Sequence, residues 1–416
     1  MFMIKKERQA MLVTMDYLLT TPEAERLYRQ YAQQLPIIDF HNHLSASDIG
    51  SHRRFENLTQ LWLASDPYKH RLMRICGIPE LYITGSADPF DKFEKFCDVF
   101  PMLAGNPVFD WSKTELSHVF GVEEEICGKN ARHIYDRVGE MLDSPEYSYK
   151  GILDRFSIVY QSPVAQLSED ISAFDGKTVA PSLRGDDLLT AELDMASITA
   201  RLDAFHEKGC RFADHALDAG FFEDDRWQKL VQLAGEYAKR GWTLLLHIGA
   251  VRATSPRLAK LAGPAGGYAA AGSIPAEKIA QLLGVMEEAG GLPDTVLFPL
   301  NMADQAAYSV LQGSFSQDGV ASKVQLGPAW WWCDHALGIE NTLNCIASFG
   351  VVSQFIGMTT DSRSVLSFLR HDYFRRILCN WMAEQNGRWQ LSEERLGQIV
   401  EKICYYNAYD KITRGK

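Results

Sequence analysis

The sequence predicts an α/β protein whose core is a (β/α)8 barrel of the TIM type. Eight short runs of apolar or β-branched residues recur along the chain, and helix-like segments lie between most of them. From the second run onward, their starts are 22, 32, 32, 53, 28 and 31 residues apart. Because one strand and its helix take about 30 residues in such a barrel, the spacing and the alternation together favour this fold.

Each expected strand is short and ends in polar residues or at a turn. The runs are IIDF (37–40), FSIVY (156–160), TVAPSL (178–183), CRFADH (210–215), WTLLLHI (242–248), TVLFPL (295–300), KVQLGPA (323–329) and QFIGMTTD (354–361). Helical patterns mark residues 198–209 and 224–241, and Gly241 closes the second of these segments as a C-cap. Strands that alternate with helices indicate a parallel sheet.

The interval between the first and second strands, residues 44–155, is much longer than the others and is rich in helical patterns, aromatic residues and charges. We predict that residues 1–43 and 156–416 form the barrel and that residues 44–155 form a helical insertion. Active sites of such barrels lie on the face built by the loops that follow the strands. Because the insertion follows the first strand, we expect it to roof the active site.

A second long interval contains the Gly/Ala-rich stretch LAGPAGGYAAAGS (261–273). It lacks the GK[ST] sequence of a phosphate-binding P-loop. We therefore expect a mobile loop over the site rather than a phosphate cradle.

Composition limits the classes of function. The chain has 416 residues, of which 46% are hydrophobic, enough for a large core and too many for global disorder. The formal net charge is −11 without a long basic run, which argues against nucleic acid and anionic membranes as partners. No stretch of about 18 uncharged apolar residues could span a membrane. We expect a small-molecule partner and a homo-oligomer.

Cysteine use and the first residues bear on location. The eight cysteines are scattered and show no CxxC spacing, so we expect reduced thiols in a cytoplasmic protein. Residues 1–20 imitate a signal peptide only loosely, because Asp16 interrupts their apolar run and no small-residue cleavage site follows. We therefore expect that this segment is not a secretion signal.

Two histidines at the end of the first strand, His41 and His43, indicate metal binding. Side chains at positions i and i+2 of a strand point the same way, so both imidazoles would face the barrel axis. A catalytic divalent ion needs at least one more ligand. Asp361 can supply it, because it ends the eighth strand, which neighbours the first in a closed barrel. The alternative is two satisfied core histidines, with Asp361-Ser362 as a helix N-cap.

Other expected strand ends carry residues that could line the same site. They are Arg184, His247 with Arg252 on the loop that follows it, Trp330-Trp331-Trp332, and Arg363. His247 could be structural or catalytic, and the tryptophans could be core residues or one wall of a sugar pocket. Asp214-His215 could line the site or cap a helix, and we favour the cap. A GxSxG elbow and a GxGxxG fingerprint are absent, which argues against serine-nucleophile and nicotinamide chemistry.

Several stretches are more specific than the barrel pattern. They are DFHNHL (39–44), DPYKHRLMR (66–74), PSLRGD (181–186), LLLHIGAVR (244–252), KVQLGPAWWWCD (323–334) and SQFIGMTTDSRSVLSFLRHDYFRRILCN (353–380). Together they resemble the uronate isomerases (glucuronate/galacturonate isomerases) of the amidohydrolase superfamily. The resemblance extends from residue 39 to about residue 407.

The resemblance implies an aldose–ketose isomerase that converts D-glucuronate to D-fructuronate, D-galacturonate to D-tagaturonate, or both. It implies one divalent ion, typically zinc, on His41, His43 and Asp361. It further implies catalytic roles for Asp361, Tyr68 and His247. Substrate-binding roles are implied for Arg184, Arg252, Trp330 and Arg363.

The chain departs from the family pattern in three places. Pro67 stands before Tyr68 where the family has histidine, and Tyr160-Gln161-Ser162-Pro163 replaces a Thr/Asp-rich end of the second strand. Met302 replaces the proline of an Asn-Pro-x-Asp pattern that begins at Asn301. None of these changes removes an expected metal ligand, but they leave the uronate epimer open.

The residues themselves suggest how such an isomerisation could proceed. A divalent ion can polarise the carbonyl and the adjacent hydroxyl group as a Lewis acid. Asp361, or water beside it, is the expected base, and Tyr68 is the expected shuttle for hydroxyl protons. Arg252 and Arg363 are placed to bind the uronate carboxylate. The alternatives are a metal-dependent hydrolase or decarboxylase on the same barrel, and a sugar-acid binding protein without activity.

Overall fold

The computed structural model describes residues 13–192, 194–263 and 266–414. Its centre is a curled parallel sheet of seven strands in the order β1-β2-β3-β4-β5-β8-β9. These strands are β1 (Ile37–Asn42), β2 (Ile158–Gln166), β3 (Ser182–Arg184), β4 (Phe212–Leu217), β5 (Thr243–Ile248), β8 (Asp294–Pro299) and β9 (Val324–Leu326). A short antiparallel pair, β6 (Ala250–Val251) and β7 (Ala270–Ala271), follows β5.

The first seven strands expected from the sequence are present near their predicted positions. Every residue of β1 and of β5 is buried, as is typical of parallel strands that are covered on both faces. In the register of the sheet, His247 in β5 lies between Ala216 in β4 and Phe298 in β8. Because the strands are parallel, their carboxyl ends meet at one edge, where barrel active sites lie.

The eighth expected strand, residues 354–361, is wrong, because this segment forms no strand in the part of the chain that the structure describes. Backbone hydrogen bonds tie its end to β1 at only two points. The amide of Asp361 donates to the carbonyl of His41 at 3.1 Å, and the amide of His43 donates to the carbonyl of Ser362 at 2.9 Å. The segment thus lies beside β1 without extending the sheet.

The side chain of Asp39 in β1 explains why residues 354–361 do not extend the sheet. Its carboxylate is fully buried and accepts hydrogen bonds from the backbone amide of Thr360 at 2.7 Å and from the hydroxyl of Thr359 at 2.8 Å. The hydroxyl of Thr360 donates to its second oxygen at 2.8 Å. A side chain of β1 therefore takes a backbone donor that a strand would have given to a ladder.

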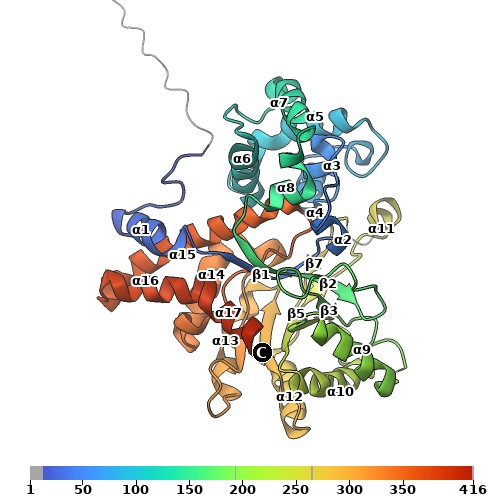
Figure 1. The fold of residues 1–416 in the computed structure, drawn as a ribbon, viewed down its shortest axis with the longest axis vertical. Helices are drawn as coiled ribbons and strands as arrows, with labels where there is room; N and C mark the ends of the chain where they lie inside the picture. Colours follow the sequence, from blue (N-terminus) through green and yellow to red (C-terminus); the bar gives the residue numbers. More distant parts are fainter. Residues whose placement is uncertain (1–12, 193, 264–265, 415–416) are drawn as a thin grey trace, which may run out of the picture.

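Helices fill the chain between β1 and β2. They are α2 (Ala46–Ile49), α3 (Leu58–Trp62), α4 (Pro67–Ile75), α5 (Pro89–Val99), α6 (Pro107–Phe120), α7 (Gly128–Leu142) and α8 (Tyr149–Leu153). In Figure 1, α3, α5, α6 and α7 gather at the top of the view, with α2, α4 and α8 between them and the sheet. Their core is aromatic, with the ring of Trp62 5.9 Å from that of Phe93 and 5.3 Å from that of Phe96.

The remaining helices follow the later strands or flank the chain ends. They are α1 (Pro22–Leu27), α9 (Met195–Glu207), α10 (Arg226–Lys239), α11 (Pro256–Ala262), α12 (Ala276–Glu288), α13 (Gln305–Ser314), α14 (Ala336–Phe349), α15 (Leu369–Trp389), α16 (Glu393–Glu401) and α17 (Asn407–Thr413). The predicted helices at 198–209 and 224–241 correspond to α9 and α10. Gly241 follows α10 with a φ of 65°, a left-handed backbone that glycine adopts without strain.

The structure bears on the expectations about thiols and membrane spans, and only partly on those about residues 1–20 and the Gly/Ala-rich loop. All eight cysteines are free thiols. Among the described helices, none has the length and apolarity needed to cross a bilayer. The expectation about residues 1–20 falls largely on residues 1–12, and the expected mobile loop includes residues 264–265; both ranges lie outside the described part.

Candidate active site

A cavity of about 320 Å³ opens where the carboxyl ends of the strands face α4. Its volume lies in the range of pockets that enclose small molecules. The site residues predicted from the sequence all line it: His41, His43, Tyr68, Arg184, His247, Arg252, Trp330, Asp361 and Arg363. Trp331 lines it as well, whereas Trp332 stacks behind Trp331 with ring centroids 5.0 Å apart.

His41, His43 and Asp361 meet at one point of the cavity wall. Nε2 of His43 lies 3.0 Å from Oδ1 of Asp361, and Nε2 of His41 lies 3.3 Å from the same oxygen. In a tetrahedral zinc site with bonds of about 2.0–2.1 Å, two ligand atoms lie roughly 3.3 Å apart. The three side chains therefore fit the ligand set of one divalent cation.

The backbone around Asp361 is strained to place this carboxylate. Its φ of 46° lies in the left-handed region, which is rare for a residue other than glycine. The hydroxyl of Thr359 accepts a hydrogen bond from the amide of His41 at 2.9 Å, while it also contacts Asp39. Strained positions of this kind persist where surrounding contacts over-determine them, and they cluster at functional sites.

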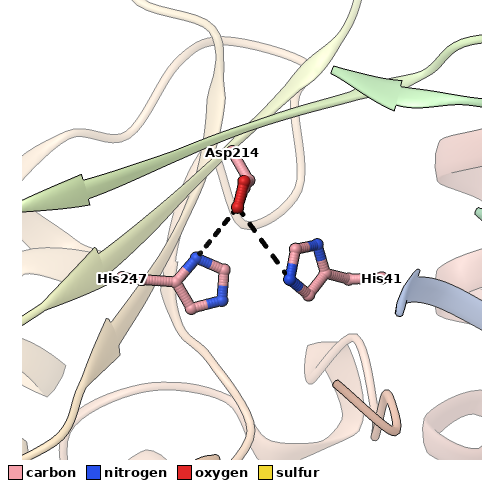
Figure 2. Close-up of side chains that lie close together, drawn as sticks. All are labelled: His41, Asp214 and His247. Carbon is pink, nitrogen blue, oxygen red and sulfur yellow. Dashed lines mark ion pairs between the residues drawn. The ribbon is translucent and has the colours of Figure 1, made fainter. Parts of the chain in front are cut away.

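Asp214 lies closer to the site than the sequence analysis predicted. The helix cap predicted for Asp214-His215 is wrong for Asp214, which is an interior residue of β4 and lines the cavity. Figure 2 shows its carboxylate pointing between His41 and His247. Its Oδ2 lies 3.9 Å from Nε2 of His41 and 3.8 Å from Nδ1 of His247, and Arg184 donates to it at 3.4 Å.

The alternation of side chains along a strand could have separated Asp214 from its neighbour. Adjacent residues of a strand point to opposite faces, so only one of Asp214 and His215 can face the barrel axis. His215 points away from the cavity, and its Nε2 lies 3.0 Å from the hydroxyl of Tyr237 in α10. The aspartate is therefore the functional candidate of the pair.

His41, Asp214 and His247 form a second group that could hold a cation. It uses the same Nε2 of His41 as the first group, and one nitrogen lone pair binds one ion. Its separations of 3.9 and 3.8 Å are also wider than those around Asp361. The two groups are thus alternatives for one cation, and the tighter one is His41, His43 and Asp361.

His247 sits in an aromatic environment at the end of β5. Its ring stacks on Phe298 and meets Trp330 edge-on, with both centroid distances 4.6 Å. Burial, with a further contribution from His41, lowers the pKa of His247 to about 3. The imidazole is therefore neutral near pH 7 and can serve as a hydrogen-bonding group for a sugar hydroxyl.

Tyr68 enters the cavity from the first turn of α4. Asp66 caps this helix by accepting the amide of Tyr68 at 2.9 Å, and Pro67 occupies a first-turn position where its fixed φ suits a helix start. The departure at Pro67 therefore has a structural role. Burial, reinforced by Asp334, raises the pKa of Tyr68 well above its ordinary value, so the phenol is protonated near pH 7.

The chain after β5 covers the cavity beside α4. Gly267 and Ala269 line it, and a side chain on Gly267 would collide with the carbonyl oxygen of Pro67. Arg71 of α4 donates to the carbonyl of Ala269 at 3.3 Å. This close approach explains why glycine is required at position 267.

The three cavity arginines differ in their partners. Arg184 is bonded to Asp186 at 2.9 Å as well as to Asp214. Arg252 and Arg363 form no hydrogen bond or ion pair with any residue of the described part, and the guanidinium of Arg252 lies 5.2 Å from the ring centroid of Trp331. Two positive charges thus face the cavity without a protein counter-ion.

Two further departures from the family pattern, at residues 160–163 and at Met302, lie away from the cavity. The second strand continues to Gln166, so Tyr160 is not at its end, contrary to the sequence prediction; its side chain is buried near Phe212. Asn301 caps the turn that begins at Met302. Neither Tyr160 nor Met302 is among the cavity-lining residues.

Comparisons with known proteins agree on one family. A family model described as glucuronate isomerase matches residues 10–195 and 223–411. The chain is 36% identical to a uronate isomerase of Caldanaerobacter subterraneus subsp. tengcongensis, with 94% of this chain and 97% of that relative covered.

Solved structures show the same likeness. The uronate isomerase of Thermotoga maritima superposes with a TM-score of 0.87 at 26% identity, covering 97% of this chain and 100% of that one. The glucuronate isomerase of Caulobacter crescentus superposes with a TM-score of 0.86 at 20% identity, covering 98% of each chain. At such low identity the second comparison bears on the fold alone.

Proposed function

Because the chain belongs to the glucuronate isomerase family, we propose that its cavity binds one hexuronate and one divalent cation and isomerises the sugar with the residues described above. The protein is an enzyme of the class that interconverts aldose and ketose uronates. The finer assignments proposed here are the metal, the residue roles and the epimer, with D-glucuronate, D-galacturonate or both as substrates.

One observation carries the proposal. A ligand set of two imidazoles and a carboxylate, 3.0 and 3.3 Å apart, lies in the same cavity as two guanidinium groups without a protein counter-ion. A hexuronate needs both features, since one end undergoes carbonyl chemistry while the other carries a carboxylate. Arginine is the side chain best suited to bind a carboxylate in bidentate fashion.

The chain's own residues supply the proton transfers and the positioning. A divalent cation, zinc being our choice, would act when bound as a Lewis acid toward the carbonyl and the adjacent hydroxyl group. We assign the proton transfer between C2 and C1 to Asp361, or to water beside it, and the proton transfer between the hydroxyl groups to Tyr68. Arg252 and Arg363 bind the carboxylate of the sugar.

The other cavity residues orient the substrate. Neutral His247 hydrogen-bonds a sugar hydroxyl, and Trp330 provides an apolar wall beside it. Asp214 and Arg184 are bonded to each other, so they present a fixed acceptor and a fixed donor next to His41. Such preorganised polar groups need no rearrangement when charge develops on the substrate.

We also propose that residues 44–155 act as the roof of the site and residues 1–43 and 156–416 as the barrel. The contribution of Asp66, Pro67 and Tyr68 to the cavity lining supports this division. A cytoplasmic location and a homo-oligomer belong to the same proposal. The free thiols agree with a cytoplasmic location.

The test of the function is a panel of hexuronates with and without a chelator. Ketose formation from D-glucuronate or D-galacturonate, abolished by the chelator and restored by added zinc, is the expected result. Release of a hydrolysis product or of carbon dioxide instead would favour the metal-dependent hydrolase or decarboxylase. Tight binding of a uronate without turnover would favour a binding protein.

Metal content gives a separate prediction. We expect close to one divalent ion per chain in the purified protein, and its loss in His41→Ala or His43→Ala, because three ligands with an open position form a typical catalytic zinc site. Elemental analysis after dialysis measures this. The control is His133→Ala in α7, a histidine that is 68% exposed and paired with Glu124, which should retain the metal. Two ions per chain, or undiminished metal in His43→Ala, would contradict the prediction.

A further inference from the structure

A largely buried carboxyl group, that of Asp334, lies next to the hydroxyl of Tyr68, and its side chain is 15% exposed. The hydroxyl of Tyr68 donates to Oδ2 of Asp334 at 3.1 Å. Arg370 of α15 donates to the same oxygen at 3.3 Å. Among the described residues Asp334 does not line the active-site cavity. It therefore reaches a bound sugar only through the phenol of Tyr68.

One side of Asp334 is largely apolar. It faces a separate cavity of about 20 Å³, whose walls include Ile339, Phe355 and Phe374. A space of this size holds about one water molecule, and the Asp334 side chain is 15% exposed, so solvent reaches only a small part of it. Burial raises the pKa of Asp334 to about 7, with Arg370 opposing the rise. A group whose pKa lies near the working pH is suited both to take up and to return a proton.

We propose that Asp334 is a positioning residue for Tyr68, which fixes the phenol hydroxyl and takes up its proton whenever Tyr68 accepts one from the sugar. This inference rests on the proton-shuttle role proposed for Tyr68. It adds a group that has no contact with the substrate, and it makes the tyrosine one half of a two-residue relay.

The relay balances in protons. As the sugar O–H bond breaks, its proton forms a new O–H bond on Tyr68, while the original phenol proton moves to Oδ2 of Asp334. The reverse movement returns a proton from Asp334 to Tyr68 and from Tyr68 to the neighbouring sugar oxygen. No electron transfer is involved, and after one turnover both side chains are in their starting states.

Arg370 completes the relay by balancing its charge. Its guanidinium lies 4.8 Å from the ring centroid of Tyr68 and 3.9 Å from that of Trp111, and its side chain is 4% exposed. This cation favours the ionised form of Asp334, which is the form that can accept a proton. The titratable groups that face Asp334 are Tyr68, Arg370, Asp361, Tyr373 and Cys333.

The decisive variant is Asp334→Asn, which keeps an acceptor for the Tyr68 hydroxyl but cannot take up a proton. We expect kcat to fall about 10²-fold, at the lower end for a proton-transfer group, with little change in KM. Because the ionised carboxylate is the acceptor, wild-type kcat should rise with pH through about 7 and then level off. The Asp334→Asn variant should lack this limb. The proposal is overturned if Asp334→Asn keeps the wild-type kcat and the same rise of kcat with pH.

Two further variants separate proton uptake from simple packing. Asp334→Glu retains an ionisable carboxyl group and should recover the pH limb that Asp334→Asn lacks; its failure to do so, in a folded protein, counts against the relay. The matched control is Asp372→Asn in α15, since Asp372 accepts a hydrogen bond from Tyr28 and pairs with Arg376 in a similar cluster remote from the cavity. This control should keep the wild-type pH profile.

A double-mutant cycle distinguishes this inference from the function on which it rests. If Asp334 acts only through Tyr68, the double variant Tyr68→Phe/Asp334→Asn turns over at the rate of Tyr68→Phe alone, whereas additive losses overturn the inference. A slow Tyr68→Phe beside a fully active Asp334→Asn refutes the relay but leaves the Tyr68 assignment intact. A fully active Tyr68→Phe refutes the assignment itself.

Discussion

Replacement of Tyr68 with phenylalanine is expected to leave the fold and the metal site intact and to lower kcat by ~10²–10⁴, the usual contribution of a positioned proton-transfer group. The ring of Tyr68 packs edge-on against Trp111 and Trp332, with centroids 5.5 and 5.4 Å away, and phenylalanine keeps both contacts. Only the hydroxyl is lost, and its partner Asp334 retains Arg370. Steady-state kinetics on the uronate that turns over, with metal analysis, measure the effect.

The control for this prediction is Tyr160→Phe. Tyr160 is buried in β2 and does not line the cavity, so removal of its hydroxyl should leave kcat near the wild-type value. Thermal unfolding of both variants shows whether either substitution disturbs the fold. Wild-type turnover by Tyr68→Phe would mean that the phenol has no part in proton transfer and that α4 only closes the cavity.

Much of the fold could be predicted because a parallel sheet leaves a strong local signal. Fully buried strands such as β5 read as continuous apolar runs, and the intervals between them match one βα unit. The eighth strand could not be predicted correctly, because its run of apolar and Thr residues looks like a strand locally. Its backbone instead bonds to the side chain of Asp39, a contact across 321 positions that no local pattern encodes.

The difference between local sequence signals and long-range contacts also explains which site residues could be predicted. His41, His43, His247 and Arg184 stand at or near strand ends, and barrel geometry alone brings such positions to one opening. The sequence analysis favours a helix cap for Asp214-His215 over a place in the site, although the alternation of side chains along a strand could have separated Asp214 from His215. Asp334 carries no such signal, since its contact with Tyr68 arises only where α4 packs onto the loop after β9.

The largest expected discrimination concerns the carboxylate of the sugar. We predict that D-glucose and other neutral hexoses react at least ~10³-fold less well in kcat/KM than the preferred hexuronate. A site built to bond one group rejects analogues that lack it by about 10⁴ or more, and the predicted margin is set below that value. Arg252 is exposed to solvent and lines the cavity, so a bound sugar must replace part of the water around its guanidinium. A neutral sugar would leave it unpaired.

This attraction must come from the cavity itself. With a formal net charge of −11, the protein as a whole repels a sugar acid. Charges are screened beyond about 8 Å at physiological ionic strength, so only nearby guanidinium groups can recruit the anion. Arg252 and Arg363 are the two cavity arginines without a protein counter-ion in the described part, whereas Arg184 is already held by Asp186 and Asp214. The carboxylate end of the sugar should therefore face the first two.

Arg252→Met and Arg363→Met test this assignment, since methionine keeps much of the side-chain length and removes the charge. Each should erase much of the preference by lowering kcat/KM for the hexuronate while that for glucose stays nearly unchanged. Arg132→Met in α7 is the control, because Arg132, like Arg252, lies over an aromatic ring, that of Phe90, but does not line the cavity. Comparable kcat/KM values for glucose and glucuronate in the unmodified protein would refute the carboxylate assignment. A loss that is equal for both sugars would instead mean that the arginines support the fold of the site rather than select its substrate.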